Sequence, residues 1–217
     1  FIEKNKSKSF FCYLSFNAPH TPLQVPEKYY KMYKDLDPES GFSENSFLNK
    51  MNEKDKDDAR RIYGMITNID ENVGKVIDKL DELNIKEETL IIFMSDNGPQ
   101  QIRYNGRMKG RKGTVYSGGT RVPFYLKYPN KFSQPKEINQ LSAHIDILPT
   151  ISEICNVDLP QDRKIDGKSL MPLIENKNTN QRHLFSYWTR RYPEKYINIS
   201  IQNDSYKLVG NTDYDSN

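Results

Sequence analysis

"LIIFMSDNGPQ", residues 90–100, is the stretch of sequence that decides the fold. Apolar residues follow one another without alternation, and the run then ends abruptly in Asp96, Asn97, Gly98 and Pro99. Continuous apolar runs of this kind are typical of strands that are covered on both faces, as in parallel sheets. Because ligands of open α/β sheets bind beyond the carboxyl ends of the strands, the carboxylate and the amide at this position are candidates for a functional site.

Two further segments have the pattern of strands, and one has the pattern of a long helix. Residues 9–16, "SFFCYLSF", predict a buried strand, which ends in the proline-rich stretch 17–26. Residues 57–84 carry apolar side chains at every third or fourth position, which predicts one face of a long helix. Residues 121–129 predict a third, shorter strand. Together these segments predict an α/β fold with a largely parallel sheet flanked by helices.

The remainder of the chain predicts smaller elements. Residues 144–155, "HIDILPTISEIC", predict a helix that begins near Asp146 and tolerates a proline in its first turn. Residues 196–202 and 206–210 have the composition of strands.

Composition narrows the class of protein. The formal net charge of +3 over 217 residues is too small to indicate nucleic-acid binding. No apolar run approaches the roughly 20 residues of a membrane helix, and the first residues lack the apolar stretch of a signal peptide. Because the chain begins with Phe1 rather than Met, we expect a fragment of a longer protein. Cys12 and Cys155 lie in apolar contexts and are predicted to be buried free thiols.

Two interpretations of Asp96 and Asn97 are open. A carboxylate and an amide carbonyl are hard oxygen ligands, which suit Ca²⁺ or Mg²⁺. Asp and Asn also hydrogen-bond their own backbone in turns, and Asn-Gly is a common turn pair. Taken alone, the dipeptide favours the turn.

The loop that follows Asn97 favours the binding of an anion. It is rich in glycine, which lets the backbone approach a ligand closely. It contains no Asp or Glu, and a cationic loop beside a metal suits an oxyanion substrate. A solvated basic loop is the alternative, whereas nucleic-acid contact is disfavoured because no aromatic stacking platform is evident. The cationic residues are Arg103, Arg107, Lys109, Arg111, Lys112 and Arg121.

His20 follows the first predicted strand in a loop made rigid by prolines. If the strands are parallel, His20 and the Asp96-Asn97 pair lie on the same edge of the sheet. A histidine there can donate a proton to a leaving group near neutral pH. A structural or surface role is the alternative for any single histidine.

Taken together, these residues resemble the sulfatase family of the alkaline-phosphatase-like superfamily. Several of the family's motifs occur in the family's order and cover residues 10 to about 175. The resemblance implies an α/β, alkaline-phosphatase-like fold with an incomplete, largely parallel sheet, and part of a small C-terminal α+β subdomain. The matching stretches are "FFCYLSFNAPHTPLQVPEKY", "IDENVGKVIDKLDEL", "TLIIFMSDNGP", "GRKGTVYSGGTRVP", "HIDILPTI" and "DGKSLMPLI".

The resemblance implies a role for four residues. Asp96 and Asn97 are similar to two ligands of the family's single divalent metal, usually Ca²⁺, with Mg²⁺ as the alternative. Lys112 is similar to the lysine that bridges the sulfate oxygens and the ester oxygen. His20 is similar to the histidine near the leaving oxygen, as a proton donor or a hydrogen-bond partner of the sulfate.

Two departures from the family pattern stand out. Ser117 occupies the position before the double glycine where the family has Glu. The family's nucleophile motif, Cys-x-Pro/Ser-x-Arg, whose Cys or Ser becomes formylglycine, does not occur in the chain, and neither do the paired aspartates that complete the metal site. In the family these precede the motif around His20, so we expect a C-terminal fragment that is inactive and poorly stable in isolation. Residues 1–178 are then the end of the catalytic domain, and 179–217 part of the C-terminal subdomain.

The function implied for the complete protein is hydrolysis of sulfate esters, either aryl sulfates or sulfated sugars. The alternatives are a phosphodiesterase or phosphonate hydrolase of the same superfamily, and an inactive homologue that binds anionic glycans. The family is mostly exported, which implies a periplasmic or extracellular location. A sulfated small molecule or glycan is the expected partner, without nucleic acid or a membrane span. Aromatic and cationic residues of "SYWTRRYP" fit either a glycan surface or subdomain packing, namely Tyr187, Trp188, Arg190 and Arg191.

Overall fold

The computed structural model describes residues 1–42, 50–132, 134–190, 192 and 196–210. The chain divides into two compact units, residues 1–133 and 134–217, and each is described here by itself. The predicted division of the family's domains at residue 178 is a different boundary and stays a prediction. In the described residues, no helix combines the length and the apolar character needed to cross a membrane.

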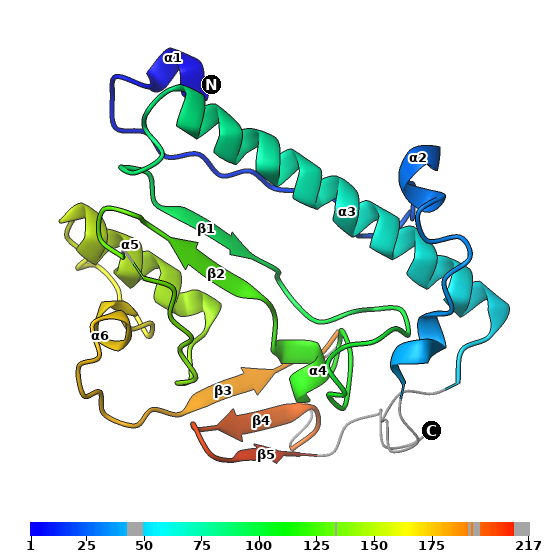
Figure 1. Ribbon diagram of the computed structural model, residues 1–217. Helices are drawn as coiled ribbons and strands as arrows, with labels where there is room; N and C mark the ends of the chain where they lie inside the picture. Colours follow the sequence, from blue (N-terminus) through cyan, green and yellow to red (C-terminus); the bar gives the residue numbers. More distant parts are fainter. Residues whose placement is uncertain (43–49, 133, 191, 193–195, 211–217) are drawn as a thin grey trace. The chain divides into compact units, whose positions relative to one another are not determined.

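The first unit contains one long helix, several short helices and a pair of strands (Figure 1). The mixture of helix and sheet agrees with the predicted α/β class. Its elements are α1 (Ile2–Asn5), α2 (Glu27–Tyr30), η1 (Pro38–Gly41), α3 (Glu53–Glu82), β1 (Ile91–Met94), α4 (Ser117–Thr120) and β2 (Phe124–Lys127).

Helix α3 confirms the helix predicted over residues 57–84 and begins four residues earlier. Its start is fixed by a capping box, in which the Asn52 side chain accepts from the Asp55 N–H and the Asp55 carboxylate accepts from the Asn52 N–H. Its apolar face is buried, with Ile62 fully inaccessible to solvent. The helix ends before Asn84, which adopts a left-handed backbone conformation at φ 54°.

Helix α2 packs closely on α3. A Cβ on Gly64 of α3 would lie 3.0 Å from Val25 and 3.1 Å from the Tyr29 backbone, so glycine permits this approach. The Tyr29 hydroxyl donates to the Glu71 carboxylate at 2.5 Å, and Tyr29 is almost completely buried. The interface therefore joins apolar packing to a hydrogen bond with a charged acceptor.

Strands β1 and β2 pair antiparallel, with Ile92 opposite Leu126. They confirm the strands predicted within residues 90–96 and 121–129, although both are shorter than predicted. The connection from β1 to β2 runs through the cationic loop and the short helix α4. Every strand pair among the described residues is antiparallel, so the parallel neighbours of the predicted sheet are not among them.

The strand predicted over residues 9–16 is wrong. The segment forms no strand, and its aromatic residues are exposed, with Phe11 at 72% and Tyr13 at 76%. A strand requires a hydrogen-bonded partner, and none of the described strands pairs with this segment. The prediction of buried thiols is also wrong, because Cys12 lies on this exposed segment and Cys155 is exposed at the end of its helix; both are unpaired.

The second unit combines short helices with a three-stranded sheet of order β3-β4-β5, paired antiparallel throughout. The strands confirm the patterns seen at residues 196–202 and 206–210, whereas β3 was not predicted. Its elements are η2 (His144–Asp146), α5 (Ile147–Cys155), α6 (Met171–Ile174), β3 (Leu184–Tyr187), β4 (Ile199–Gln202) and β5 (Lys207–Val209).

A buried ion pair organises this unit. Asp146 precedes α5, as predicted, and is completely inaccessible to solvent. Its carboxylate accepts from the backbone N–H groups of Ala143 at 2.7 Å and Lys168 at 2.9 Å, and from Arg182 at 2.8 and 2.9 Å. Close packing supports this arrangement, since a Cβ on Gly167 would lie 1.8 Å from the Ile145 carbonyl oxygen.

We expect Arg182→Met to lower the free energy of unfolding by about 3 kcal/mol, because it leaves a buried carboxylate without its cation. Arg163→Met is the matched control. Arg163 pairs with Asp162 at 2.7 Å, but both side chains are about two-thirds exposed, and such pairs contribute little. Urea denaturation of both variants tests the difference, and equal losses would contradict the structural role given to Asp146.

Candidate functional site

Asp96 and Asn97 lie just after the end of β1 at Met94, as predicted, and form a short turn. The Asp96 Oδ1 accepts from the Asn97 N–H at 2.9 Å, and the Asn97 Nδ2 donates to the Gly98 carbonyl at 2.9 Å. These bonds commit the amide nitrogen of Asn97 to the backbone. The Asn97 Oδ1 makes no hydrogen bond with any residue in the described ranges. The turn and the ligand interpretations are therefore compatible, because the turn orients the side chains and leaves this oxygen available.

A cluster of glycines fixes the turn against α4. The Gly98 N–H donates to the Gly119 carbonyl at 2.9 Å, and the Gly118 N–H donates to the Lys109 carbonyl at 2.7 Å. A Cβ on Gly98 would lie 1.8 Å from the Gly118 carbonyl oxygen, and one on Gly118 would lie 2.1 Å from the Gly110 carbonyl oxygen. Only backbone can occupy these positions, so the cluster sets the two ends of the cationic loop side by side.

Lys112 is joined to the same turn by its backbone. Its N–H donates to the Pro99 carbonyl at 2.8 Å, which places Lys112 next to the segment that carries Asp96 and Asn97. The side chain is half-buried, and it forms no ion pair with a residue that the structure describes. A lysine whose backbone is joined to this turn has a side chain that is chemically suited to the charge of an oxyanion.

His20 lies in the exposed turn after residues 9–16. Its Nδ1 is 2.8 Å from the Thr21 carbonyl oxygen. Because a carbonyl only accepts, Nδ1 carries a proton, and Nε2 is the ring nitrogen that this backbone contact leaves unengaged. No hydrogen bond among the described residues joins His20 to Asp96 or Lys112. The structure therefore brings Lys112 to the Asp96-Asn97 turn but does not tie His20 to them.

The residues present fit part of a site for a hard cation. Asp96 and Asn97 supply oxygen atoms, the ligand type that Ca²⁺ and Mg²⁺ prefer. Among the residues that the structure describes, no group of three or more His, Cys, Asp or Glu side chains is arranged to hold a metal. Since Ca²⁺ takes six to eight oxygens, further ligands must come from outside this turn.

Sequence reasoning missed Asn105, which holds the cationic loop together. The Asn105 Nδ2 donates to the carbonyls of Met108 at 2.9 Å and Gly110 at 3.2 Å, while its Oδ1 is buried without a partner in the described part of the chain. The Asn-Gly pair at residues 105–106 is a turn signal that could have marked it.

Ser117 and Trp188, which the sequence also singled out, lie outside the Asp96-Asn97 turn. Ser117 is the first residue of α4, and its carbonyl accepts from the Arg121 N–H at 2.8 Å, so position 117 supports the loop end. In the second unit, Trp188 is 41% exposed rather than packed in a core, and the Arg190 guanidinium lies 5.6 Å from its ring. Arg191 lies outside the described residues.

The chain belongs to the sulfatase family. The family model "Sulfatase" matches residues 1–157, and the model "N-sulphoglucosamine sulphohydrolase, C-terminal" matches residues 110–216. The two matches overlap over residues 110–157, which include Lys112.

Individual relatives agree with this assignment. The chain is 31% identical over 209 residues to human steryl-sulfatase, with 91% of this chain and 31% of the relative covered. It is 32% identical over 198 residues to an arylsulfatase of Clostridium perfringens, with 82% of this chain and 40% of the relative covered. The chain thus spans about a third of the length of these relatives.

A solved structure confirms the predicted fold class. The crystal structure of Ps i-CgsB in complex with k-i-k-neocarrahexaose matches with a TM-score of 0.76 and 27% sequence identity. The match covers 96% of this chain and 43% of that chain. The alkaline-phosphatase-like α/β fold of the sulfatases is therefore the fold of this chain, present in part.

Proposed function

We propose that the protein to which this chain belongs hydrolyses sulfate esters, and that this chain supplies metal ligands and sulfate-binding groups but not the nucleophile. The observation that carries the proposal is the backbone bond from Lys112 to Pro99, which holds a cation beside the Asp96-Asn97 turn. Because the chain belongs to the sulfatase family, we interpret this geometry as part of a site that binds a sulfate ester.

Each residue has a defined task in this proposal. The Lys112 ammonium binds the sulfate and balances the negative charge that develops on its oxygens. His20 presents Nε2, which donates a proton to the departing oxygen when the ring is protonated. Asp96 and Asn97 hold the cation, Ca²⁺ or Mg²⁺, which neutralises charge on the sulfate when bound. The nucleophile, expected to be formylglycine, is assigned to no residue of this chain.

The substrate class is a sulfated small molecule or glycan. The relatives named above are a steryl-sulfatase and an arylsulfatase, and the matched crystal structure contains an oligosaccharide by its description. We propose that the protein is exported to the periplasm or out of the cell, because most members of the family are exported. The relatives named above are all sulfatases or of sulfatase fold, so the phosphate-ester alternative is not favoured.

Metal loading tests the proposal directly. In the full-length protein, we expect Asp96→Ala and Asn97→Ala each to lower kcat/KM for 4-nitrophenyl sulfate by about 100-fold or more, with a matching loss of bound metal, because each removes an oxygen ligand. The control is Asp78→Ala, which removes an exposed carboxylate from α3.

The outcomes separate the competing functions. Chelation of the metal should abolish turnover, and added Ca²⁺ should restore it. Hydrolysis of 4-nitrophenyl phosphonate but not of the sulfate would establish the phosphonate alternative. Binding of sulfated glycans without turnover of any ester would establish the inactive homologue.

A further inference from the structure

A tight turn over residues 111–114 carries Lys112 at its corner. The Thr114 N–H donates to the Arg111 carbonyl at 3.0 Å, which is the bond that closes a four-residue β-turn. Gly113, the third residue of the turn, has φ 84°, and a type II turn requires a positive φ at this position. Lys112 is the second residue of the turn, so the direction in which its side chain leaves the backbone depends on how firmly the turn is closed.

The Thr114 hydroxyl closes the same turn a second time. It donates to the Arg111 carbonyl at 2.9 Å and accepts from the Arg111 N–H at 3.2 Å. A hydroxyl can form both bonds because it has one donor and two acceptor lone pairs. Thr114 therefore holds both backbone polar groups of the residue that precedes Lys112.

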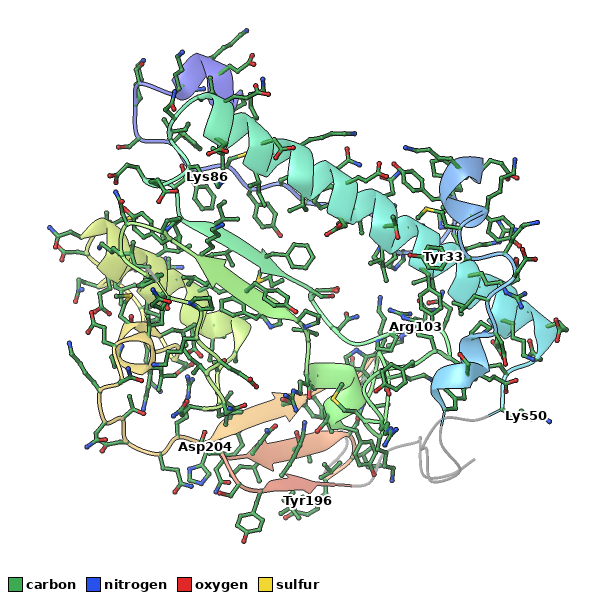
Figure 2. The ribbon with its side chains drawn as sticks, in the orientation of Figure 1. Tyr33, Lys50, Lys86, Arg103, Tyr196 and Asp204 are labelled. Carbon is green, nitrogen blue, oxygen red and sulfur yellow. The ribbon has the colours of Figure 1, made fainter. Side chains whose placement is uncertain are left out.

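The turn packs closely against α4 and against the loop that precedes it. A Cβ on Gly119 of α4 would lie 2.2 Å from the Thr114 carbonyl oxygen and 2.6 Å from the Arg111 carbonyl oxygen. A Cβ on Gly110 would lie 2.5 Å from the Thr114 Oγ1. Figure 2, in which Arg103 is labelled, shows this loop between β1 and α4. The surroundings thus leave the Thr114 side chain little room to move without displacing the turn.

We propose that Thr114 is a positioning residue for Lys112, whose ammonium group reaches the sulfate from the turn that the Thr114 hydroxyl closes. This inference rests on the proposed function. The backbone on either side of Lys112 is held by the Thr114 hydroxyl on Arg111 and by the bond from the Lys112 N–H to the Pro99 carbonyl. A group that stabilises transition-state charge must be placed accurately, and a displacement of about 1 Å can lower the rate by about 100-fold. Thr114 acts through Lys112 and takes no part in the chemistry.

The test uses the full-length protein and compares a threonine of this turn with a threonine elsewhere. Thr114→Val removes the hydroxyl and keeps the shape of the side chain, whereas Thr114→Ser keeps the hydroxyl. Thr89→Val is the matched control. Thr89 is half-buried, as Thr114 is, and its hydroxyl donates to the Ile85 carbonyl at 2.7 Å before the start of β1, at the opposite end of that strand from Asp96.

We expect Thr114→Val to lower kcat/KM for 4-nitrophenyl sulfate by about 10- to 100-fold. Thr114→Ser should stay within about threefold of wild type because it keeps the donor and the acceptor, and Thr89→Val should stay within about twofold. The double variant Lys112→Ala/Thr114→Val separates positioning from a general structural role. Because Thr114 acts through Lys112, its replacement should change the residual kcat/KM by less than about twofold once the ammonium group is absent.

Two outcomes would overturn the inference while leaving the proposed function intact. One is a Thr114→Val protein as active as Thr89→Val. The other is an equal loss from Thr114→Val in the wild-type and the Lys112→Ala backgrounds, since the hydroxyl would then support the loop as a whole. If circular dichroism shows that Thr114→Val does not fold, Thr114→Ala replaces it in the same comparison, because alanine places no methyl group against the Arg111 carbonyl. If the wild-type protein does not hydrolyse the sulfate ester, the proposed function fails, and this inference fails with it.

Discussion

Lys112→Ala is expected to lower kcat/KM for 4-nitrophenyl sulfate by about 100- to 1,000-fold in the full-length protein. Removal of one group that stabilises transition-state charge has an effect of this order. The backbone N–H of residue 112 still donates to the Pro99 carbonyl in the variant, so the loop should keep its shape. Bound metal and melting temperature should therefore be unchanged, which separates loss of charge from loss of structure.

The control for this variant is Lys127→Ala, which removes an exposed lysine at the end of β2. It should leave kcat/KM within about twofold of wild type. If Lys112→Ala were no more damaging than Lys127→Ala, the lysine of the loop would have no part in catalysis. The solvated basic loop would then be the correct interpretation of this segment.

Gly98→Ala is expected to destabilise the protein by about 3 kcal/mol or more, and to remove activity with it. The added Cβ would lie 1.8 Å from the Gly118 carbonyl oxygen and 3.0 Å from the Gly119 Cα, and backbone cannot turn aside as a flexible side chain can. Overpacking of a closely packed site commonly costs about 1–3 kcal/mol, and here the strand end must also move.

Gly74→Ala provides the opposite expectation for the same chemical change. Gly74 lies inside α3, and apart from the neighbouring backbone of the helix itself no atom of the described chain lies within 4 Å of the Cβ that alanine would add. Alanine should stabilise the helix by up to about 1 kcal/mol, because glycine is the poorer helix former. Urea denaturation of both variants measures the contrast. A Gly98→Ala protein as stable as wild type would show that the turn and α4 are not in contact.

Sequence patterns predicted the elements that depend on local information. Helix α3 follows from the spacing of its apolar residues, although the capping box at Asn52 that begins it was overlooked. The segment of residues 9–16 was mistaken for a strand because apolar composition does not reveal whether a partner strand is present. Exposure of Phe11 and Tyr13 is the result of that missing partner.

The candidate site was likewise predicted from the sequence only in part. The turn at Asp96 was visible in the sequence because a carboxylate, an amide and a glycine interrupt an apolar run. The contact between Lys112 and Pro99 was not, because it joins residues that are distant in sequence, and only the resemblance to sulfatases singled out this lysine.

The backbone bonds at the base of the cationic loop have a consequence for protein engineering. Two hydrogen bonds between main-chain atoms close this base: the Lys112 N–H donates to the Pro99 carbonyl, and the Gly118 N–H donates to the Lys109 carbonyl. Neither bond involves a side chain of the intervening residues. We expect residues 100–104 to tolerate exchange for the corresponding segments of other sulfatases. Libraries confined to these positions would vary the loop while the backbone that carries Asp96, Asn97 and Lys112 stays constant.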